Sequence, residues 1–190
     1  MTAGGGPKDA ERLLRDATAM LDGHFQLTSG KHSSIYVEKF RLLERPAQTE
    51  ALCRMIADWA RPLSPELVAG PTTGGIIMSY EVARLLGVRS IFAEPVNGGG
   101  RAFQRGFTIA SGERVLVVDD VLTTGGSVRE VLAAVRNMGG EVAAVAVLID
   151  RTGGTADFGV PFFACLTLDL PSYEPVQCPL CAKNLPLKVT

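Results

Sequence analysis

Residues 115–128 read VLVVDDVLTTGGSV, and this stretch carries the strongest structural signal in the chain. Its four consecutive apolar residues predict a strand covered on both faces, as in a parallel sheet flanked by helices. Two acids follow, and then a Thr-Thr-Gly-Gly-Ser turn opens a helix. In open α/β sheets, ligands bind beyond the carboxyl ends of the strands. The stretch therefore predicts a fold class and the edge of the sheet where a ligand binds.

The turn after the two acids has the chemistry of an anion site. Successive N–H groups of a glycine-rich turn and a helix N-terminus attract anions. The turn lacks the Gly-Lys-Ser/Thr ending of a nucleoside-triphosphate loop, so it suits a terminal monophosphate. Asp119 and Asp120 stand where carboxylates accept hydrogen bonds from sugar hydroxyls and assist a hard cation. The residues predicted to bind the phosphate are Thr123, Thr124, Gly125, Gly126 and Ser127.

A second glycine-rich turn, GPTTGG at residues 70–75, leaves the predicted buried strand 67–69 and enters a helix. Two such turns on neighbouring strands fit a substrate with phosphates at both ends. A plain strand-to-helix turn is the alternative, because glycine turns are common. The residues expected at this second anion site are Thr72, Thr73 and Gly74.

Alternating apolar patterns surround the two turns. They predict helices near residues 13–21, 52–59, 76–86 and 128–138, strands at 90–93, 142–149 and 162–168, and short strands within 25–40. This order predicts a parallel sheet with helices on both faces. Residues 97–106 hold three consecutive glycines and two arginines, and this composition predicts a mobile loop.

Composition narrows the class of protein. The chain has 190 residues and a net charge of -1, which fits one domain and excludes a global basic field for nucleic acid. The longest apolar run is too short to span a bilayer, and residues 1–14 have no apolar core of a secretory signal. Four cysteines do not indicate a disulfide scaffold. We therefore expect a cytoplasmic protein without nucleic-acid or membrane partners.

Residues 115–128 resemble the phosphoribosyl-pyrophosphate signature of the type I phosphoribosyltransferases, with Ser127 at its last hydroxyl position. Residues 70–75 stand where that family has its pyrophosphate loop. The resemblance implies an α/β type I phosphoribosyltransferase fold, with a central, mainly parallel sheet flanked by helices and a small N-terminal hood. It implies a single domain over residues 1–190, with a core at roughly 46–159 and a hood at roughly 20–45 plus 160–190.

Three further stretches resemble the orotate branch of that family. Residues 25–36, FQLTSGKHSSIY, resemble its hood segment, and the ending CPLC at residues 178–181 resembles a tail of some members. Ile149-Asp150-Arg151 resembles an Asp-Arg pair whose arginine contacts the base. An anionic base requires donors, which Arg151 and N–H groups near Lys31 can supply. The alternative for Arg151 is a surface ion pair with Asp150 or Asp157.

The resemblance implies that orotate displaces pyrophosphate from 5-phosphoribosyl 1-pyrophosphate and forms orotidine 5′-monophosphate, in de novo pyrimidine biosynthesis. It also implies Mg²⁺ and a homodimer. Two alternatives stay open at this point. One is a phosphoribosyltransferase for a purine base, and the other is a regulatory protein that binds the same sugar phosphate without turnover.

One departure from the family pattern lies between residues 94 and 107, where the family's mobile loop carries lysines and a histidine. Here the only cations are Arg101 and Arg105. Arginine can neutralise a leaving pyrophosphate, but its pKa prevents it from acting as a general acid. We expect both arginines to have an electrostatic role in catalysis. The alternative is that they only keep the loop soluble.

The cysteines and histidines give a weaker signal. Cys178 and Cys181 form one Cys-x-x-Cys pair, which is half of a four-ligand zinc site. The sequence favours a metal-free pair over zinc shared across a dimer. It indicates that His24 and His32 are surface or hood residues, not metal ligands, and that the remaining cysteines, Cys53 and Cys165, belong to the core.

Overall fold

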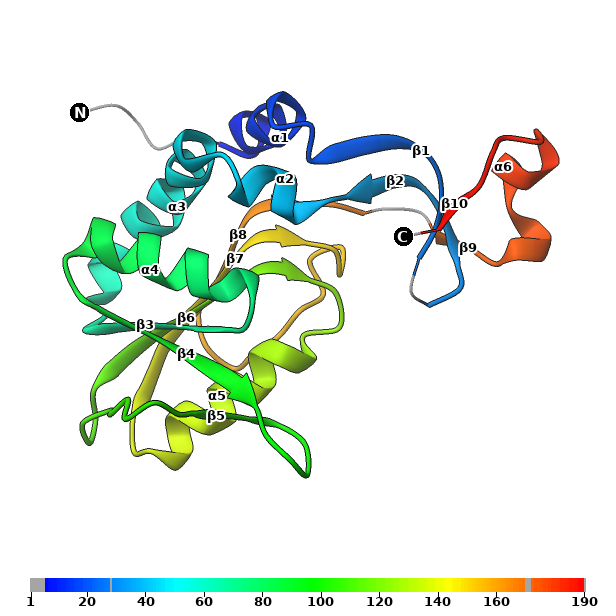
Figure 1. The fold of residues 1–190 in the computed structure, drawn as a ribbon. Coiled ribbons are helices and arrows are strands. Elements are labelled where there is room, and N and C mark those ends of the chain that lie inside the picture. The colour runs from blue at the N-terminus through cyan, green and yellow to red at the C-terminus, as the bar shows by residue number, and fades with distance from the viewer. Residues whose placement is uncertain (1–5, 28, 170–171, 190) are drawn as a thin grey trace.

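The computed structural model describes residues 6–27, 29–169 and 172–189. Its larger sheet has six strands in the order β5-β4-β3-β6-β7-β8 (Figure 1). All neighbouring pairs are parallel except β4 with β5. This is the mainly parallel sheet that the sequence predicts. Its strands are β3 Leu67–Pro71, β4 Arg89–Pro95, β5 Arg101–Phe103, β6 Arg114–Leu122, β7 Glu141–Asp150 and β8 Phe162–Thr167.

Helices cover both faces of this sheet. α3 (Pro46–Ala60) and α4 (Gly74–Leu86) lie on one face and α5 (Gly126–Asn137) on the other, above and below the sheet in Figure 1. Side chains of β6 alternate between the two resulting cores: Leu116 belongs to the α3–α4 core and Val117 to the α5 core. Both are fully buried. The uninterrupted apolar run of β6 follows from this, because neither face of the strand meets water.

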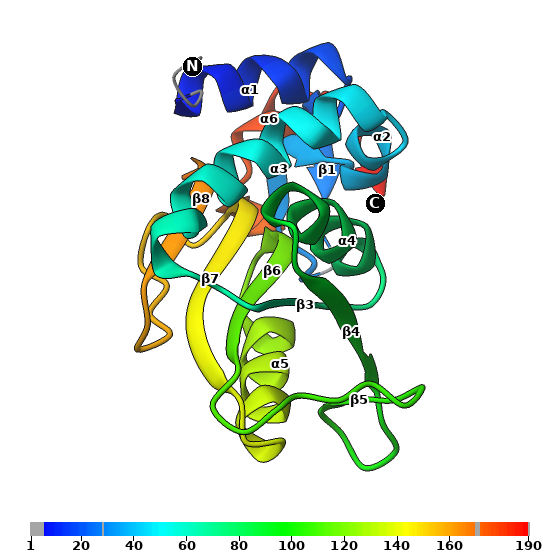
Figure 2. The same cartoon turned by 90° about the vertical axis from the view of Figure 1, so that its left-hand side faces the viewer.

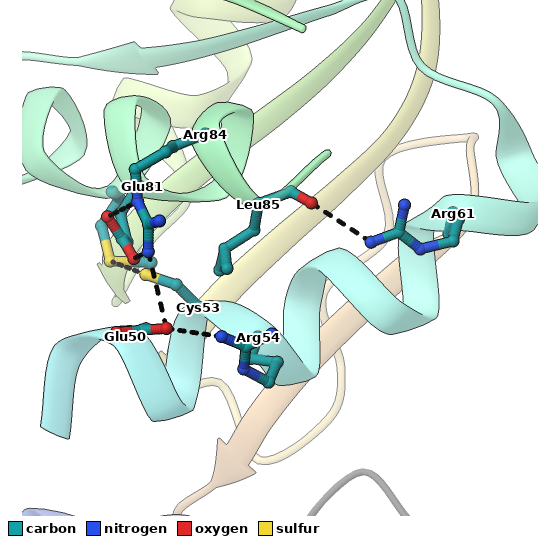
Figure 3. Close-up of polar contacts among 8 residues, drawn as sticks. Glu50, Cys53, Arg54, Arg61, Glu81, Arg84 and Leu85 are labelled. Atoms are coloured by element: carbon teal, nitrogen blue, oxygen red, sulfur yellow. Dashed lines mark hydrogen bonds and ion pairs between the residues drawn. The ribbon is translucent and has the colours of Figure 1, made fainter. Parts of the chain in front are cut away.

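Polar contacts join α3 to α4 at the surface of the first core. Figure 3 shows Arg84 reaching Glu50 of α3 as well as Glu81 of its own helix. Farther along, Arg61 of the short helix η1 (Arg61–Leu63) donates to the Leu85 carbonyl at 3.2 Å. Exposed pairs of this kind contribute little to stability. They connect α3 and η1 to α4, the helix that begins at the second glycine-rich turn.

The hood is a second sheet with the order β10-β1-β2-β9. Figure 1 shows it projecting from one side of the six-stranded sheet. In Figure 2, which is turned by 90°, the six-stranded sheet faces the viewer and the hood lies behind it. Its hairpin comes from early residues, whereas its two outer strands come from late ones. The hood elements are β1 Met20–Gln26, β2 His32–Val37, β9 Ser172–Tyr173 and β10 Lys188–Val189, with α6 Pro179–Ala182 and the short helix η2 Pro175–Gln177 between the last two strands.

Two predicted boundaries need correction. The first helix, α1, spans Pro7–Asp16 and does not reach residue 21. Thr18 has a left-handed φ of 53°, which ends the helical path, and the chain re-enters as β1. Residues 162–167, assigned to the hood from the sequence, instead form β8 at the edge of the larger sheet. The late part of the hood begins only at β9.

The predicted loop at residues 97–106 also differs from expectation. Residues 101–103 form β5, which pairs antiparallel with β4 through Pro95–Arg101 and Ala93–Phe103. Gly98, Gly99 and Gly100 all have positive φ, at 93°, 96° and 80°, a backbone region that favours glycine. The three glycines therefore build the turn of a hairpin.

The histidines and cysteines follow only part of the prediction. Cys53 and Cys165 are buried in the core as expected, at 0% and 1% exposure. His24 and His32 do lie in the hood, but they are buried at 3% and 4% exposure, so the surface interpretation is wrong. This burial could not be predicted from the sequence, because the residues that contact the two histidines lie about 150 positions later in the chain. Among the described residues, no helix is long and apolar enough to cross a membrane.

Candidate functional site

The two glycine-rich turns leave the same edge of the larger sheet. β3 and β6 are parallel neighbours, with Ala69 opposite Val117, so the turns that follow them emerge side by side. Each turn leads directly into a helix, α4 or α5. Two helix N-termini and two sets of backbone N–H groups are thus brought to one place, where they favour negative charge.

The turn after β6 surrounds a small hollow of about 50 Å³, lined by Asp119 and residues 121–128. Gly125, the N-cap of α5, has a left-handed φ of 78°. A Cβ there would meet the Phe158 ring at the ordinary contact distance of 3.4 Å, so it is the positive φ that favours glycine at this position. The structure brings all five predicted phosphate-binding residues together around this hollow.

The two acids are part of β6 and are almost buried, Asp119 at 8% exposure and Asp120 at 2%. The Asp119 carboxylate accepts the Asp120 N–H at 2.8 Å, and Asp120 accepts the Val121 N–H at 2.6 Å. Lys39 lies 3.0 and 2.8 Å from the two carboxylate oxygens of Asp120. Sequence analysis missed Lys39, because only the fold brings the residue that follows the hood hairpin against β6.

The two carboxylates experience different electrostatics. Burial, and then the neighbouring charge of Asp120, raise the pKa of Asp119 to about 7. The hydrogen bond from the Asp120 N–H, and then the charges of Lys39 and Arg101, act in the opposite direction. Near neutral pH, Asp119 of the ligand-free protein is therefore divided between its neutral and charged forms. A cation or a developing positive charge beside it favours the charged form.

The turn after β3 is tightly packed against the acids. A Cβ on Gly74 would lie 1.7 Å from Asp120 Oδ2, and one on Gly70 would lie 2.4 Å from the Gly75 carbonyl. Only glycine permits these approaches. The Thr72–Thr73 peptide bond is cis. The close approach of Gly74 to Asp120 therefore brings this turn against the acid pair.

The two arginines of the β4–β5 hairpin occupy different environments. Arg101 is largely buried and reaches the second turn, donating to Thr72 Oγ1 at 3.0 Å. It also lies 3.2 Å from Glu130 of α5. Arg105 is exposed and pairs with Glu94 at 2.7 Å. The structure thus brings Arg101 to the candidate site, whereas Arg105 is paired on the outer part of the hairpin.

A larger cavity of about 380 Å³ opens beside the phosphate turn. Arg151, which follows β7, shares its lining with Leu27 and Ser29 of the hood and with Thr123 and Thr124. Burial lowers the pKa of Arg151. Within the described part of the chain, no carboxylate lies within ion-pair distance of this arginine. The cavity therefore presents a cation to whatever enters it.

Asp150 does not neutralise that cation. Its side chain is fully buried and accepts hydrogen bonds from the Thr152 N–H and hydroxyl, both at 2.7 Å, and from the Gly154 N–H at 3.1 Å. These bonds fix the turn after β7. The surface ion pair considered from the sequence is therefore not the role of Arg151.

Lys31 lies in the hood, close in sequence to Leu27 and Ser29, which line this cavity. Lys31 itself is not one of the residues that line the cavity. Its ammonium is 3.1 Å from Glu174, just after β9. The Lys31 carbonyl accepts the Leu27 N–H at 2.8 Å, which closes the loop between β1 and β2. The structure therefore places Lys31 as a link between the loop and the late segment of the hood.

Comparisons with known proteins agree with this geometry. Residues 42–174 match the family model of the phosphoribosyl transferase domain. A protein of Pelotomaculum thermopropionicum named orotate phosphoribosyltransferase is 53% identical over 92% of this chain and 91% of its own. One of the same name from Desulforamulus reducens is 50% identical over 88% and 87%. The crystal structure of orotate phosphoribosyltransferase from Aeropyrum pernix superposes with a TM-score of 0.72, 28% identity, and coverage of 83% and 92%.

Proposed function

Because the chain belongs to the orotate phosphoribosyltransferases of the phosphoribosyl transferase domain family, we propose that it transfers the 5-phosphoribosyl group of 5-phosphoribosyl 1-pyrophosphate to orotate. Orotate N1 attacks C1′ of 5-phosphoribosyl 1-pyrophosphate, the bond from C1′ to pyrophosphate breaks, and orotidine 5′-monophosphate forms. The reaction belongs to de novo pyrimidine biosynthesis. Catalysis then depends mainly on positioning and on stabilising charge.

The observation that carries this proposal is the arrangement around Arg151. Its cation faces a cavity of about 380 Å³ that shares Thr123 and Thr124 with the phosphate turn. A base that carries a carboxylate pairs with a guanidinium through charge-assisted hydrogen bonds. An anionic base next to a phosphorylated ribose fits this juxtaposition. A neutral purine could accept hydrogen bonds from Arg151, but it would lack the attraction between opposite charges that a carboxylate gains.

The remaining residues are assigned along the sugar. The turn Thr123–Ser127 binds the 5-phosphate through N–H groups and hydroxyls. Asp119 and Asp120 accept hydrogen bonds from the ribose hydroxyls and stabilise the positive charge that develops on the ring as pyrophosphate leaves. Lys39 holds the Asp120 carboxylate in place.

The second turn receives the leaving group. The pyrophosphate is received by Thr72, Thr73 and Gly74. Arg101, which donates a hydrogen bond to Thr72, adds its positive charge there. Arg105 closes over the same group when the hairpin moves. Hard oxygen donors are the groups that Mg²⁺ accepts, and hydroxyls and carboxylates meet at this edge. Mg²⁺ would be bound through the pyrophosphate oxygens beside these residues, and when bound it neutralises phosphate charge.

The assembly and setting are proposed with the same reaction. The enzyme acts as a cytoplasmic homodimer, with the whole chain forming one domain. Exposed apolar side chains on α4 support a partner surface: Ile77 is 40% exposed and Tyr80 is 65% exposed, and both line a shallow groove. A sedimentation measurement that gives the mass of a single chain at micromolar concentration would contradict the dimer.

The experiment that tests the function is a substrate comparison. The purified protein is incubated with 5-phosphoribosyl 1-pyrophosphate, Mg²⁺ and one base at a time: orotate, uracil, adenine or hypoxanthine. Loss of orotate absorbance with release of pyrophosphate is the expected result, with at least about a hundredfold preference over the neutral bases. Preference for adenine or hypoxanthine would identify a purine enzyme. Binding of the sugar phosphate without consumption of any base would identify a regulatory protein.

A further inference from the structure

Four potential metal ligands meet in the hood, outside the candidate active site. His24 lies on β1 and His32 on β2, while Cys178 follows η2 and Cys181 lies in α6. The nitrogen or sulfur atoms that these side chains offer all lie within 4.8 Å of one another. Figure 1 shows α6 at the far end of the hood, away from the six-stranded sheet. The cluster thus joins the early hairpin to the late segment of the chain.

Four of the six distances between the potential ligand atoms lie near the edge lengths of a tetrahedral zinc site, and all six are within 4.8 Å. Bond lengths of about 2.3 Å to sulfur and 2.0–2.1 Å to nitrogen in zinc sites imply edges of about 3.3 Å between two nitrogens and 3.6 Å between nitrogen and sulfur. His24 Nε2 lies 2.9 Å from His32 Nδ1, 3.5 Å from Cys178 Sγ and 3.7 Å from Cys181 Sγ. Cys181 Sγ lies 3.3 Å from His32 Nδ1.

The orientation of His24 is set by a bond on its other side. Its Nδ1 lies 2.9 Å from the Leu185 carbonyl, which can only accept, so Nδ1 carries the proton. The lone pair of Nε2 then points into the cluster, toward three other potential ligands. A histidine that donates its outer N–H to a carbonyl is the usual support for a metal ligand. A cation at the centre satisfies the Nε2 lone pair and both sulfurs together.

The chemistry of the four side chains indicates which metal. Two imidazoles and two thiols, with no carboxylate, suit Zn²⁺ and disfavour Mg²⁺ or Ca²⁺. Four protein ligands also leave no open position, as in structural zinc sites. We propose that His24, His32, Cys178 and Cys181 bind one Zn²⁺ in a structural site that fastens the late segment of the chain to the hood hairpin.

The segment between β9 and β10 needs such a link, because it buries little apolar surface. Val176 is 92% exposed, Leu185 44% and Leu187 42%. The flanking strands contribute only two residues each to the hood sheet. Short segments without their own core are typically stabilised by a metal or a disulfide. Zinc at the cluster supplies that stability without any contact to the larger sheet.

The link extends to the proposed base pocket. Glu174 lies between β9 and the metal-binding segment, and it pairs with Lys31 in the hood loop. The same loop contributes Leu27 and Ser29 to the cavity that contains Arg151. Zinc therefore acts as a positioning element for the wall of that cavity. It contacts neither substrate nor the reacting atoms.

Metal analysis of the purified protein tests the site, and its result does not depend on the proposed reaction. Protein isolated without chelators, or reconstituted with Zn²⁺ and desalted, should contain about one zinc per chain. A Cys178→Ser and Cys181→Ser double variant should lose it. The matched control is Cys165→Ala, which removes a buried thiol elsewhere and should retain full zinc content.

Two measurements on the unmodified chain keep the test decisive if the double variant does not fold. Replacing Zn²⁺ with Co²⁺ should produce the strong visible absorption of tetrahedral thiolate coordination. Denaturation in chelator should release four titratable thiols from the four cysteines. Substoichiometric metal after reconstitution, weak octahedral Co²⁺ bands, or only two titratable thiols, which would indicate a Cys178–Cys181 disulfide, would each overturn the proposal.

Discussion

The phosphate turn of the core and the metal-ligand cluster of the hood are both groups of polar side chains, but they are assembled differently. The turn uses residues 119–127, which are contiguous and rise from a strand buried on both faces. The cluster uses residues separated by about 150 positions. The core site is therefore built into the sheet itself. The hood site exists only when two distant parts of the chain come together.

The largest expected effect is the loss of turnover when the acid pair of the core site, Asp119 and Asp120, is replaced. Asp119→Asn with Asp120→Asn should lower turnover at least about a hundredfold, the scale of a lost electrostatic group in a transition state. Asparagine has nearly the same volume, so the melting temperature should change by only a few degrees. Steady-state rates and thermal melting measure both effects. A double variant that keeps more than about a tenth of the activity, a loss under ~1.4 kcal/mol, would contradict the assignment.

Arg151 lies where core and hood meet, so its loss should separate the two substrates. Arg151→Ala should weaken orotate by about 1.5–3 kcal/mol, which is roughly 10- to 150-fold in KM. The KM for the sugar pyrophosphate should change much less. Arg136→Ala is the matched control, because Arg136 is an exposed arginine near the end of α5. Equal weakening of both substrates would mark Arg151 as structural.

The β4–β5 hairpin tests whether contact with the second turn matters. Arg101→Ala should lower kcat about tenfold or more while KM changes less, because the interaction serves the leaving group. Arg101→Lys should recover part of the rate, since it restores the charge but not the guanidinium fork. Arg105→Ala should have a smaller effect, because the Arg105 guanidinium is exposed and contacts Glu94, whereas that of Arg101 contacts Thr72 of the second turn. Full activity in both alanine variants would reduce the hairpin to a connector.

Removing the metal should perturb the hood and spare the core. Chelator-treated protein should show a KM for orotate that is higher by a few fold, because Lys31 and its loop lose their link to the late segment. The KM for the sugar pyrophosphate should remain unchanged, and added Zn²⁺ should reverse the effect. A loss of affinity for both substrates would mean that the hood and the core are not separable in this way.

The smallest expected effect is a shift on the pH axis. Asp119 has a pKa raised to about 7 and is needed as a carboxylate, so kcat/KM should rise with pH and level off above that value. Lys39 lowers this pKa. Lys39→Met should therefore move the rising limb to higher pH, by less than one unit. A limb that stays in place would show that another group, such as the substrate phosphate, controls it.

The core site was predictable from the sequence because its residues are neighbours in the chain. A strand, two acids and a glycine-rich turn occur in order, and the parallel sheet then places the second turn beside them. The resemblance to the family's Asp-Arg pair singled out Arg151, which directly follows β7. The sequence could not distinguish Arg101 from Arg105, since the pairing of β5 with β4 decides which of the two reaches Thr72.

Contacts between distant segments were not predictable. Lys39 meets Asp120 across 81 positions of sequence, and no local pattern marks it. The Cys-x-x-Cys pair was visible as half of a metal site, but its complement lay in two single histidines on neighbouring strands. Those histidines carry no recognisable spacing of their own, because the pairing of β1 with β2 brings them together and the segment around α6 then meets them.

The order of strands in the hood sheet has a consequence for synthesis on the ribosome. All six strands of the larger sheet precede β9 and β10 in the chain. The nascent chain therefore has every strand of the phosphate-binding core before the outer strands of the hood exist, and domains begin to fold during synthesis. The hairpin β1–β2 must wait, with both edges unpaired, until the last segment emerges. Exposed strand edges invite wrong pairing, so early capture of this segment by a cation would shorten the vulnerable interval.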